Sequence, residues 1–523
     1  MRDRITKSLV YNEMPEDGRR DWFDYKRYKF LQHIDTYYYC VYLDADFTMQ
    51  TADECVIAFR HYVDKLLSQV RAAGGEMELE LDGVPMYFTV KRSRFANVYD
   101  LLLKRADHYH IFFTRYTYNS SSPQVMVQVE SKALWMDGVR RSLLESLKDV
   151  EEIALRFGFE IVCALENRID FCWHNNYFEN PELFLRSDNF AKSLLTRLQE
   201  SKTHEDFYGN ETYEIDFRSV GKRTSNNVYF RMYNKGKEVV QKQYKPFFLR
   251  NWYLNGLVSR YDLYVYEKAY EHHSWEYVDK ARLEFYTEYG ADEQLKQQCM
   301  DILNGDVHLK YDALHGFADM LTPKLTLVMN VEYQTMRKFT ATLDLEVSEH
   351  NIRRFGGCAR LFEILDAWKA ITNVLTGSVL RFVEPQGDEN KSRRDNCRFW
   401  QLLRAAKSID VKHYAADCHL MRTYNHEKDA EVVKKRILSG LASWNLYAKG
   451  NHEDAPELQV LDFLNALNDN DYDYINRNKR KKEMRQDYSD AFGLPELSGS
   501  YMFFDETTGE VILPQDGEEE EDD

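Results

Sequence analysis

The spacing of apolar residues changes once along the 523-residue chain, and this change limits the folds that the chain can adopt. Before Gly290, short apolar runs mostly alternate with polar residues, which is typical of half-buried β-strands. After Gly290, apolar residues recur at helical spacing over long stretches. A chain of this length folds into two or three domains. The pattern predicts an α+β fold, in which an antiparallel-sheet domain is followed by a mostly helical C-terminal domain.

The first part of the chain combines strand-like runs with amphipathic helices. Helical spacing covers residues 52–70, 136–157 and 183–198, and Gly158 follows the second of these stretches. Strand-like runs cover residues 37–43, 77–81, 86–90, 108–113, 125–129, 159–173, 228–232 and 281–285. The Asp82-Gly83 pair between the second and third runs predicts a hairpin.

The second part of the chain is mainly helical in pattern. Helical stretches cover residues 293–303, 360–375, 398–407, 430–447 and 457–467, and strand-like runs at 325–331 and 339–345 interrupt them. We therefore place a domain boundary near Asp292. The predicted segments are an extension at 1–32, a sheet-bearing domain at 33–292, a helical domain of unknown role at 293–490, and a weakly structured acidic tail at 491–523.

Composition limits the cellular setting and the class of protein. Hydrophobic residues make up 44% of the chain and charged residues 30%, which is typical of a soluble globular protein. The eight cysteines form no C-x-x-C pair, so free thiols in a reducing compartment are expected rather than disulfides or zinc. The N-terminus lacks an apolar leader, and no run of about 18 apolar residues occurs. We expect a cytoplasmic protein without a membrane partner.

Charge is unevenly distributed along the chain. The net charge of −17 argues against a nucleic-acid partner when taken alone. Residues 217–250, however, contain nine basic residues and one acid, Glu238, which indicates a surface for a polyanion such as DNA. The predicted DNA-binding residues in this stretch are Arg218, Lys222, Arg223, Ser225, Lys237, Lys242 and Lys245. The acidic residues 516–523 favour a disordered end, and we hypothesise that they compete with DNA for this surface.

Tyr233 is a candidate nucleophile within the basic stretch. Alternation along a strand would place Arg231, Tyr233 and Lys235 on one face. A phenol has a pKa of about 10, and flanking cations favour the phenolate and bind a phosphate. The competing interpretation is an edge strand in which Tyr233 is a packing ring. Tyr229 also remains open as the nucleophile.

Two further segments supply carboxylates. Alternation would place Glu166 and Asp170 on one strand face, within about 14 Å of each other, so a shared ion needs a third ligand. Glu284, on the strand predicted at 281–285, is the candidate for that ligand. Such oxygen ligands suit Mg²⁺ or Mn²⁺, which would polarise a scissile phosphate. The competing interpretation for each acid is an ion pair with a neighbouring arginine.

These three segments resemble the catalytic core of the replication initiation factor family. That family includes rolling-circle Rep proteins of Gram-positive plasmids and relaxases of integrative conjugative elements. The resemblance covers residues 160–290, within the predicted 33–292 domain, and depends on the order of four short motifs. They are Arg168-Ile-Asp170, Gly221-Lys-Arg-Thr-Ser225, Arg231-Met-Tyr-Asn-Lys235 followed by Glu238, and Arg282-Leu-Glu284.

The resemblance implies metal-dependent DNA strand transfer, with a 5′-phosphotyrosyl link and a free 3′-hydroxyl. Tyr233 would be the nucleophile, and Arg231 and Lys235 would contact the phosphate. Glu166, Asp170 and Glu284 would hold the Mg²⁺ or Mn²⁺ ion. The implied function is replication initiation or mobilisation of a plasmid, phage or integrative element. The implied partners are origin DNA, a host helicase or polymerase, and a second copy of the chain.

Two other functions remain open on the sequence. One is a non-catalytic DNA-binding protein of a mobile element that uses the basic stretch at 217–250. The other is an inactive scaffold in which arginine–carboxylate pairs hold the sheet together. His108 and His110 mimic a histidine metal motif, which we interpret as chance because the usual tyrosine-bearing helix does not follow. The chain contains no G-x-x-x-x-G-K-[ST] motif, so ATP-driven helicase activity is not expected.

Overall fold

The chain forms two compact units in the computed structural model, and each is described by itself. One unit comprises residues 1–421 and 507–509, and the other comprises residues 422–506 and 510–523. The described residues are 22–45, 57, 61, 64–65, 67–81, 84–89, 99, 101–105, 108–113, 123–155, 159–192, 205–208, 212–215, 217–221, 227–242, 244–410, 434, 437–438, 440–441, 444, 456–468, 470–476, 503–504 and 511–512. In the smaller unit they include α18 (Pro456–Asn465) and the strand pair β15 (Phe503–Phe504) and β16 (Val511–Ile512).

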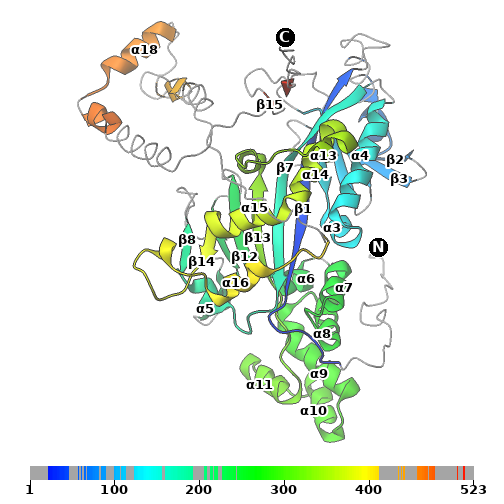
Figure 1. The fold of residues 1–523 in the computed structure, drawn as a ribbon. Helices are drawn as coiled ribbons and strands as arrows, with labels where there is room; N and C mark the ends of the chain where they lie inside the picture. The colour runs from blue at the N-terminus through cyan, green and yellow to red at the C-terminus, as the bar shows by residue number, and fades with distance from the viewer. Residues whose placement is uncertain are drawn as a thin grey trace, which may run out of the picture. The chain divides into compact units, whose positions relative to one another are not determined.

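A ten-stranded antiparallel sheet forms the centre of the larger unit (Figure 1). Its order is β11 (Phe217–Val220), β12 (Val228–Asn234), β13 (Met329–Met336), β7 (Phe159–Asn175), β1 (Phe30–Ala45), β6 (Val125–Val129), β5 (Tyr109–Phe113), β4 (Leu101–Arg105), β3 (Val84–Thr89) and β2 (Glu76–Leu81). Helices pack against this sheet, so the predicted α+β fold with an antiparallel sheet is confirmed. No helix in the described part of the chain is long and apolar enough to cross a membrane.

One face of the sheet packs on four helices and forms the main core. They are α4 (Val139–Leu155), α14 (Ala359–Asp366), α15 (Trp368–Val374) and α16 (Arg398–Ala405). Tyr37 and Tyr39 point to this face from β1, and their hydroxyls reach the carbonyl of Leu361 on α14 and the hydroxyl of Ser146 on α4. Each ring thereby buries its body while its polar tip keeps a hydrogen-bond partner.

The opposite face carries polar side chains, and helices cover one end of it. These helices are α3 (Ser131–Met136), α6 (Lys235–Gln241) and α7 (Pro246–Leu254). His174 of β7 stacks on Trp135 of α3 with a centroid distance of 4.6 Å, and it also contacts Phe248 of α7. The Asn234 side chain caps α6 by accepting from the backbone N–H of Lys237. Strand β12 therefore passes directly into α6 beside this polar face.

A helical excursion follows α7 and has its own small core. Its helices are α8 (Arg260–Glu271), η1 (Trp275–Tyr277), α9 (Val278–Tyr289), α10 (Glu293–Asn304) and α11 (Tyr311–Leu321). Leu283, Cys299 and Leu314 are buried together in this excursion. Residues 281–285, predicted as a strand, lie inside α9, so that prediction is wrong. A five-residue alternating run does not separate strand from helix, and the longer run of 278–289 favours the helix.

The strand β13 corrects the predicted domain boundary near Asp292. It pairs with β12 on one side and with β7 on the other, so residues after 292 complete the central sheet. The described residues 293–410 consequently share one unit with the sheet. The strand predicted at 339–345 is also wrong, because α12 (Arg337–Thr340) ends there and no β-strand follows at 341–345.

The remaining elements are short and connect the larger ones. They are α5 (Glu182–Arg186), β8 (Phe190–Lys192), β9 (Glu205–Tyr208), β10 (Thr212–Ile215), α13 (Glu349–Phe355), η2 (Gly356–Cys358), η3 (Leu375–Val379), β14 (Leu380–Phe382) and η4 (Lys391–Arg393). The helix predicted at 183–198 is correct at 183–186 and wrong in the rest of its described part, because α5 ends at Arg186 and β8 then pairs with β14.

Three register shifts interrupt the pairing of the two longest strands, β1 and β7. At each shift one strand holds an extra residue, which is Asp35 on β1 and Asn167 and Val162 on β7. A bulge of this kind reverses the inward and outward alternation of the residues beyond it. The bulge at Asn167 separates Glu166 from the face that carries Arg168 and Asp170.

Candidate active site

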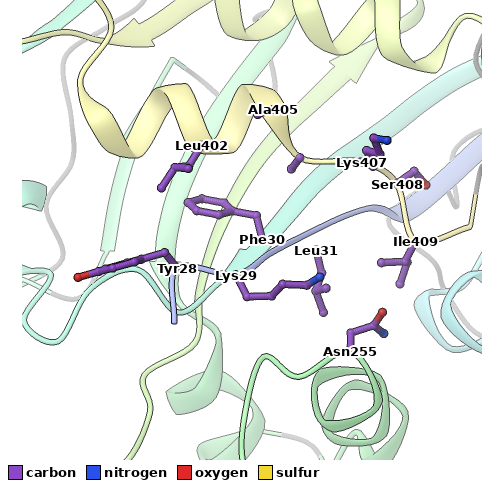
Figure 2. A pocket seen from close by; sticks show the side chains of 11 residues that line it. Tyr28, Lys29, Phe30, Leu31, Asn255, Leu402, Ala405, Lys407, Ser408 and Ile409 are labelled. Atoms are coloured by element: carbon purple, nitrogen blue, oxygen red, sulfur yellow. The ribbon is translucent and has the colours of Figure 1, made fainter. Parts of the chain in front are cut away.

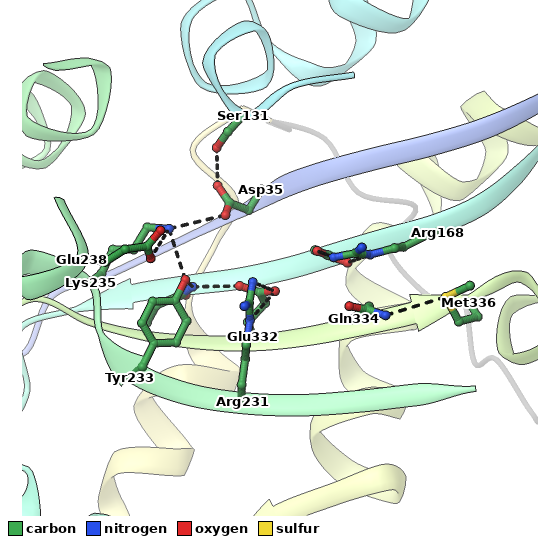
Figure 3. A network of polar contacts seen from close by, with 12 residues as sticks. Asp35, Ser131, Arg168, Arg231, Tyr233, Lys235, Glu238, Glu332, Gln334 and Met336 are labelled. Carbon is green, nitrogen blue, oxygen red and sulfur yellow. Dashed lines mark hydrogen bonds and ion pairs between the residues drawn. The ribbon is translucent and has the colours of Figure 1, made fainter. Parts of the chain in front are cut away.

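A buried polar cluster lies on the sheet face opposite the main core, at the end of β12 (Figure 3). Strand pairing sets Tyr233 opposite Asn330 of β13, and Arg231 opposite Glu332. Lys235 was expected on the same strand as Tyr233, but it is the first residue of α6. Its ammonium group nevertheless returns to the phenol. The structure thus brings Arg231, Tyr233 and Lys235 together, as the sequence predicted.

The phenol oxygen of Tyr233 accepts two hydrogen bonds. Lys235 Nζ and Asn330 Nδ2 each donate to it at 3.1 Å. Asn330 Nδ2 also donates to Glu332 Oε2 at 3.1 Å. Among the described residues, none accepts the phenol's own proton. Two N–H donors directed at one phenol oxygen favour its ionised form over its neutral form.

Lys235 is the cation at the centre of the cluster. Its side chain is only 1% exposed, and its Nζ lies 3.5 Å from Asp35 Oδ2 and 3.1 Å from Glu238 Oε2. Burial alone would lower the pKa of Lys235, but the neighbouring carboxylates raise it well above its usual value. Burial of Asp35 is likewise outweighed by Lys235, so the pKa of that carboxyl is lowered. Lys235 is therefore a fixed positive charge beside Tyr233.

Arg231 and Glu332 form a second ion pair across β12 and β13. Arg231 Nε donates to Glu332 Oε1 at 2.8 Å. The guanidinium carbon of Arg231 also lies 5.2 Å from the centroid of the Tyr233 ring. Burial raises the pKa of the Glu332 carboxyl to about 7, with Arg231 opposing the shift and Asp170 adding to it.

Burial has the larger effect on the ionisation of Tyr233. The residue is 9% exposed. Burial raises the pKa of its phenol above the ordinary value, and the charge of Lys235 opposes that shift without cancelling it. Lys235 and Arg231 do act to lower this pKa, as expected from the sequence, but burial of the ring outweighs them. Ionisation of the phenol then needs a change that admits solvent or a substrate.

The three predicted metal ligands do not converge. Asp170 lies on the cluster face, where Arg168 Nε donates to its Oδ1 at 2.8 Å. Glu166 lies on the opposite face, where it pairs with Arg360 at 3.3 Å and accepts from Thr340 Oγ1 at 2.6 Å. The bulge at Asn167 is the cause, since simple alternation would place both acids on one face.

Glu284 lies on α9 and therefore cannot belong to a strand face. It accepts from the hydroxyl of Tyr277 and lies 4.0 Å from Lys268. Within the described residues, no three His, Cys, Asp or Glu side chains gather in an arrangement that fits a metal ion. The predicted Mg²⁺ or Mn²⁺ ligands thus do not fit the group that the resemblance implies.

The predicted DNA-binding residues have different surroundings. Arg218 is 4% exposed, and its guanidinium donates to the carbonyls of Leu185 and Ser187. It therefore stabilises the end of α5 and does not form part of a DNA-binding surface. Lys242 is exposed on the α6 terminus, whereas Lys237 is half-buried. The half-buried Lys245 lies 3.7 Å from Glu238. The predictions for Lys222, Arg223 and Ser225 fall outside the described residues.

Three cluster residues were missed from the sequence. Asn330 and Glu332 lie on β13, where Asn330, Glu332 and Gln334 alternate with Val331 and Tyr333. This polar alternation inside an apolar strand was a usable signal. Asp35 lies in a bulge of β1 and had no signal in the sequence, because register shifts depend on the partner strand.

The two histidines of the His108-Tyr-His110 motif do not share a site. His108 Nε2 lies 3.5 Å from Asp137, and His110 Nε2 lies 3.4 Å from Glu130. Burial lowers the pKa of His110 to about 4, and Lys104 adds to the shift. Each ring thus contacts its own carboxylate, in line with the interpretation of this motif as chance.

Comparisons with known proteins give a distant likeness in structure. No protein-family model matches the chain, and no curated protein matches it. A solved structure of a rolling circle replication initiator protein from Geobacillus stearothermophilus is similar with a TM-score of 0.32 and 12% sequence identity. The alignment covers 73% of this chain and 100% of that chain.

Proposed function

We propose that this protein cuts and rejoins one strand of DNA with Tyr233 as the nucleophile, and that it thereby initiates rolling-circle replication or mobilisation of a plasmid, phage or integrative element. The observation that carries the proposal is the phenol oxygen of Tyr233 between two N–H donors, Lys235 Nζ and Asn330 Nδ2. A tyrosine that only packs needs an acceptor for its own proton, whereas a nucleophile needs donors that stabilise the phenolate.

The proposed reaction exchanges one ester bond for another. The oxygen of Tyr233 forms a bond to the scissile phosphorus, and the bond from phosphorus to the 3′ oxygen breaks. The proton lost by the phenol is balanced by the proton gained by the released 3′-hydroxyl. Rejoining reverses these steps, with the 3′-hydroxyl attacking the phosphotyrosine. Because each ester replaces a similar one, no external energy source is required.

Arg231 supports the placement of a phosphate at Tyr233. Its side chain is 22% exposed, and its guanidinium lies against the Tyr233 ring. A phosphate in contact with the phenol would therefore reach this guanidinium, which suits phosphate oxygens in its planar geometry. Lys242 adds an exposed positive charge at the end of the neighbouring helix.

Cleavage of supercoiled DNA tests the proposal. The substrate is a plasmid that carries the DNA flanking the protein's own gene, incubated with Mg²⁺, with Mn²⁺ or with EDTA. We expect nicked circles with protein attached to the 5′ end, and none with Tyr233→Phe. Tyr229→Phe is the matched control, and it should retain cleavage. Attachment through Tyr229, or cleavage by Tyr233→Phe, would overturn the assignment of Tyr233.

A second function is favoured by the burial of Tyr233. A non-catalytic DNA-binding protein would keep the phenol neutral, which agrees with its raised pKa. This function predicts salt-sensitive DNA binding without nicks at any metal concentration. An inactive scaffold predicts neither binding nor nicks, so the same assay separates all three functions.

A further inference from the structure

Residues 22–29 form a strip with four aromatic and three basic side chains and one acid, in the sequence Trp-Phe-Asp-Tyr-Lys-Arg-Tyr-Lys. The Phe23, Tyr25 and Tyr28 rings are 41%, 37% and 56% exposed. Lys26 and Arg27 are also exposed. Soluble proteins bury most large aromatic rings, so three exposed rings within six residues need an explanation.

The backbone of this strip is fixed although its side chains are exposed. The N–H of Lys26 donates to the carbonyl of Gly256 at 2.8 Å, and Asn176 Nδ2 donates to the carbonyl of Lys26 at 2.9 Å. The N–H of Lys29 donates to Asn176 Oδ1 at 2.8 Å. A fixed backbone holds the exposed rings in place, which reduces the entropy lost when a ligand binds to them.

Tyr28 has a strained backbone. Its φ is 57°, in the left-handed region that bulky residues rarely adopt. One side of its ring contacts Tyr177 at a centroid distance of 5.2 Å. The Tyr28 side chain is largely exposed, so packing in the core does not explain its strained backbone. Strained backbone of this kind is typical of binding sites.

A pocket of about 480 Å³ opens beside Tyr28 (Figure 2). Its lining includes Lys29 and Lys407 together with Asn255, and Leu402 and Ile409 supply apolar surface. Lys407 is exposed and Lys29 is half-buried. The acids near the strip are Asp24 and Glu179, both exposed, and Glu179 lies 3.9 Å from Arg27.

We propose that this strip and pocket bind single-stranded DNA, with a base stacked on Tyr28 and backbone phosphates at Lys29 and Lys407. The choice of DNA rests on the proposed function, although the site is separate from the Tyr233 cluster. Exposed rings with adjacent cations suit unpaired bases, because every base offers a face for stacking. Paired bases are already stacked inside a duplex and leave only the phosphates for contact.

The pocket lies close to Tyr233 in the sheet. Leu31 lines the pocket, and strand pairing places Leu31, His174, Asn330 and Tyr233 in one row across β1, β7, β13 and β12. Three strand spacings of about 4.8 Å give about 14 Å between the backbones at the two ends of this row. His174 in this row is buried beneath Trp135 and Phe248, so the row gives the separation of the two sites and not the path of the DNA. The strip would thus hold DNA close to the proposed cleavage position.

Binding of labelled oligonucleotides tests the proposal. Fluorescence anisotropy of the full chain is measured with a single-stranded thymidine 20-mer and with a blunt 20-base-pair duplex. Tyr28→Gly removes the ring and suits the left-handed backbone, and we expect about 10-fold weaker binding of the 20-mer. Tyr28→Phe should bind as the unaltered protein does. Tyr311→Ala is the matched control, since Tyr311 is 58% exposed on the distant α11.

Two further measurements keep the result decisive if a variant is destabilised. Oligonucleotides with 5-iodouracil should crosslink to residues 23–29 of the unaltered protein. Lys29→Ala and Lys407→Ala should each reduce the slope of log K against log salt by about 0.7. Unchanged binding by a folded Tyr28→Gly, no crosslink in the strip, or equal affinity for duplex would overturn the proposal. Tyr28-dependent binding without nicks would instead overturn only the proposed function.

Discussion

Lys235 Nζ lies 3.1 Å from the phenol oxygen of Tyr233, and the same nitrogen contacts one carboxylate from β1 and one from its own helix. Asp35 comes from a bulge of β1, and Glu238 comes from the first turn of α6. One buried ammonium group therefore connects β1 to the segment of residues 233–238, which lies about two hundred residues later in the chain. It also determines the charge that Tyr233 experiences.

Replacing Lys235 with methionine should destabilise the protein strongly. The change removes the ammonium that pairs with the buried Asp35 and leaves Glu238 with Lys245, and breaking a buried pair in this way costs about 3–5 kcal/mol. Lys242→Met on the exposed end of α6 is the control and should change the free energy of unfolding by about 0.5 kcal/mol or less. Urea unfolding of both variants measures the difference. Equal midpoints would contradict a structural role for the ammonium.

The free energy of unfolding should fall in acid because the Glu238 carboxylate becomes protonated. Burial favours its neutral form, but Lys235 and Lys245 outweigh burial and lower the pKa to about 2 from the ordinary 4.5. A depressed carboxyl pKa contributes stability that is complete above the unfolded pKa and is lost as the pH falls through the folded pKa. The free energy of unfolding should therefore decrease from about pH 4.5 to about pH 2. Glu238→Gln should flatten that part of the curve, whereas the exposed Glu179→Gln should not.

Replacing Glu166 should reduce the stability of the protein and leave DNA cleavage unchanged. Its carboxylate is 1% exposed and pairs with Arg360 on the face away from Tyr233. Glu166→Gln weakens this pair, and we expect a loss of about 1–3 kcal/mol in unfolding free energy. The metal dependence of any DNA cleavage should remain that of the unaltered protein. If Glu166→Gln specifically lost the metal dependence of cleavage, Glu166 would again be a candidate metal ligand.

Gly357 should not tolerate a side chain. A Cβ built on Gly357 would lie 1.7 Å from the carbonyl oxygen of Val162, the residue that forms a bulge in β7. Because backbone rather than a flexible side chain blocks the space, Gly357→Ala should cost about 3 kcal/mol or more. Gly316→Ala on α11 meets no atom within 4 Å and should stabilise by about 0.5–1 kcal/mol. Thermal unfolding of the two variants measures whether Gly357→Ala is destabilised and Gly316→Ala is stabilised.

Elements with long and regular periods were predictable from the sequence. The helix predicted at 136–157 corresponds to α4, and the strand predicted at 159–173 corresponds to β7. The strand at 228–232 was also correct, although β12 extends to Asn234. These segments are long or strongly apolar, so their type could be read from the local pattern even though two bulges change the facing of β7.

The errors arose where the partner of a segment decides its structure. The alternating run at 281–285 became helical because Leu283 packs into the core with Cys299 of α10. Glu166 was assigned to the wrong face because the bulge at Asn167 depends on the neighbouring β1. The grouping of Arg231, Tyr233 and Lys235 was predictable from adjacency, whereas Asn330 comes from β13, about a hundred residues later.

The insertion of β13 has a consequence for the order in which the protein assembles. During synthesis, β7 and β12 leave the ribosome long before residues 329–336, which lie between them in the finished sheet. Until those residues arrive, both strands have an unpaired edge, and Tyr233 lacks the Asn330 amide that donates to it. A chain stopped at residue 292 would keep every motif that resembles the replication initiation factor family, yet it would lack the strand that joins those motifs into one site.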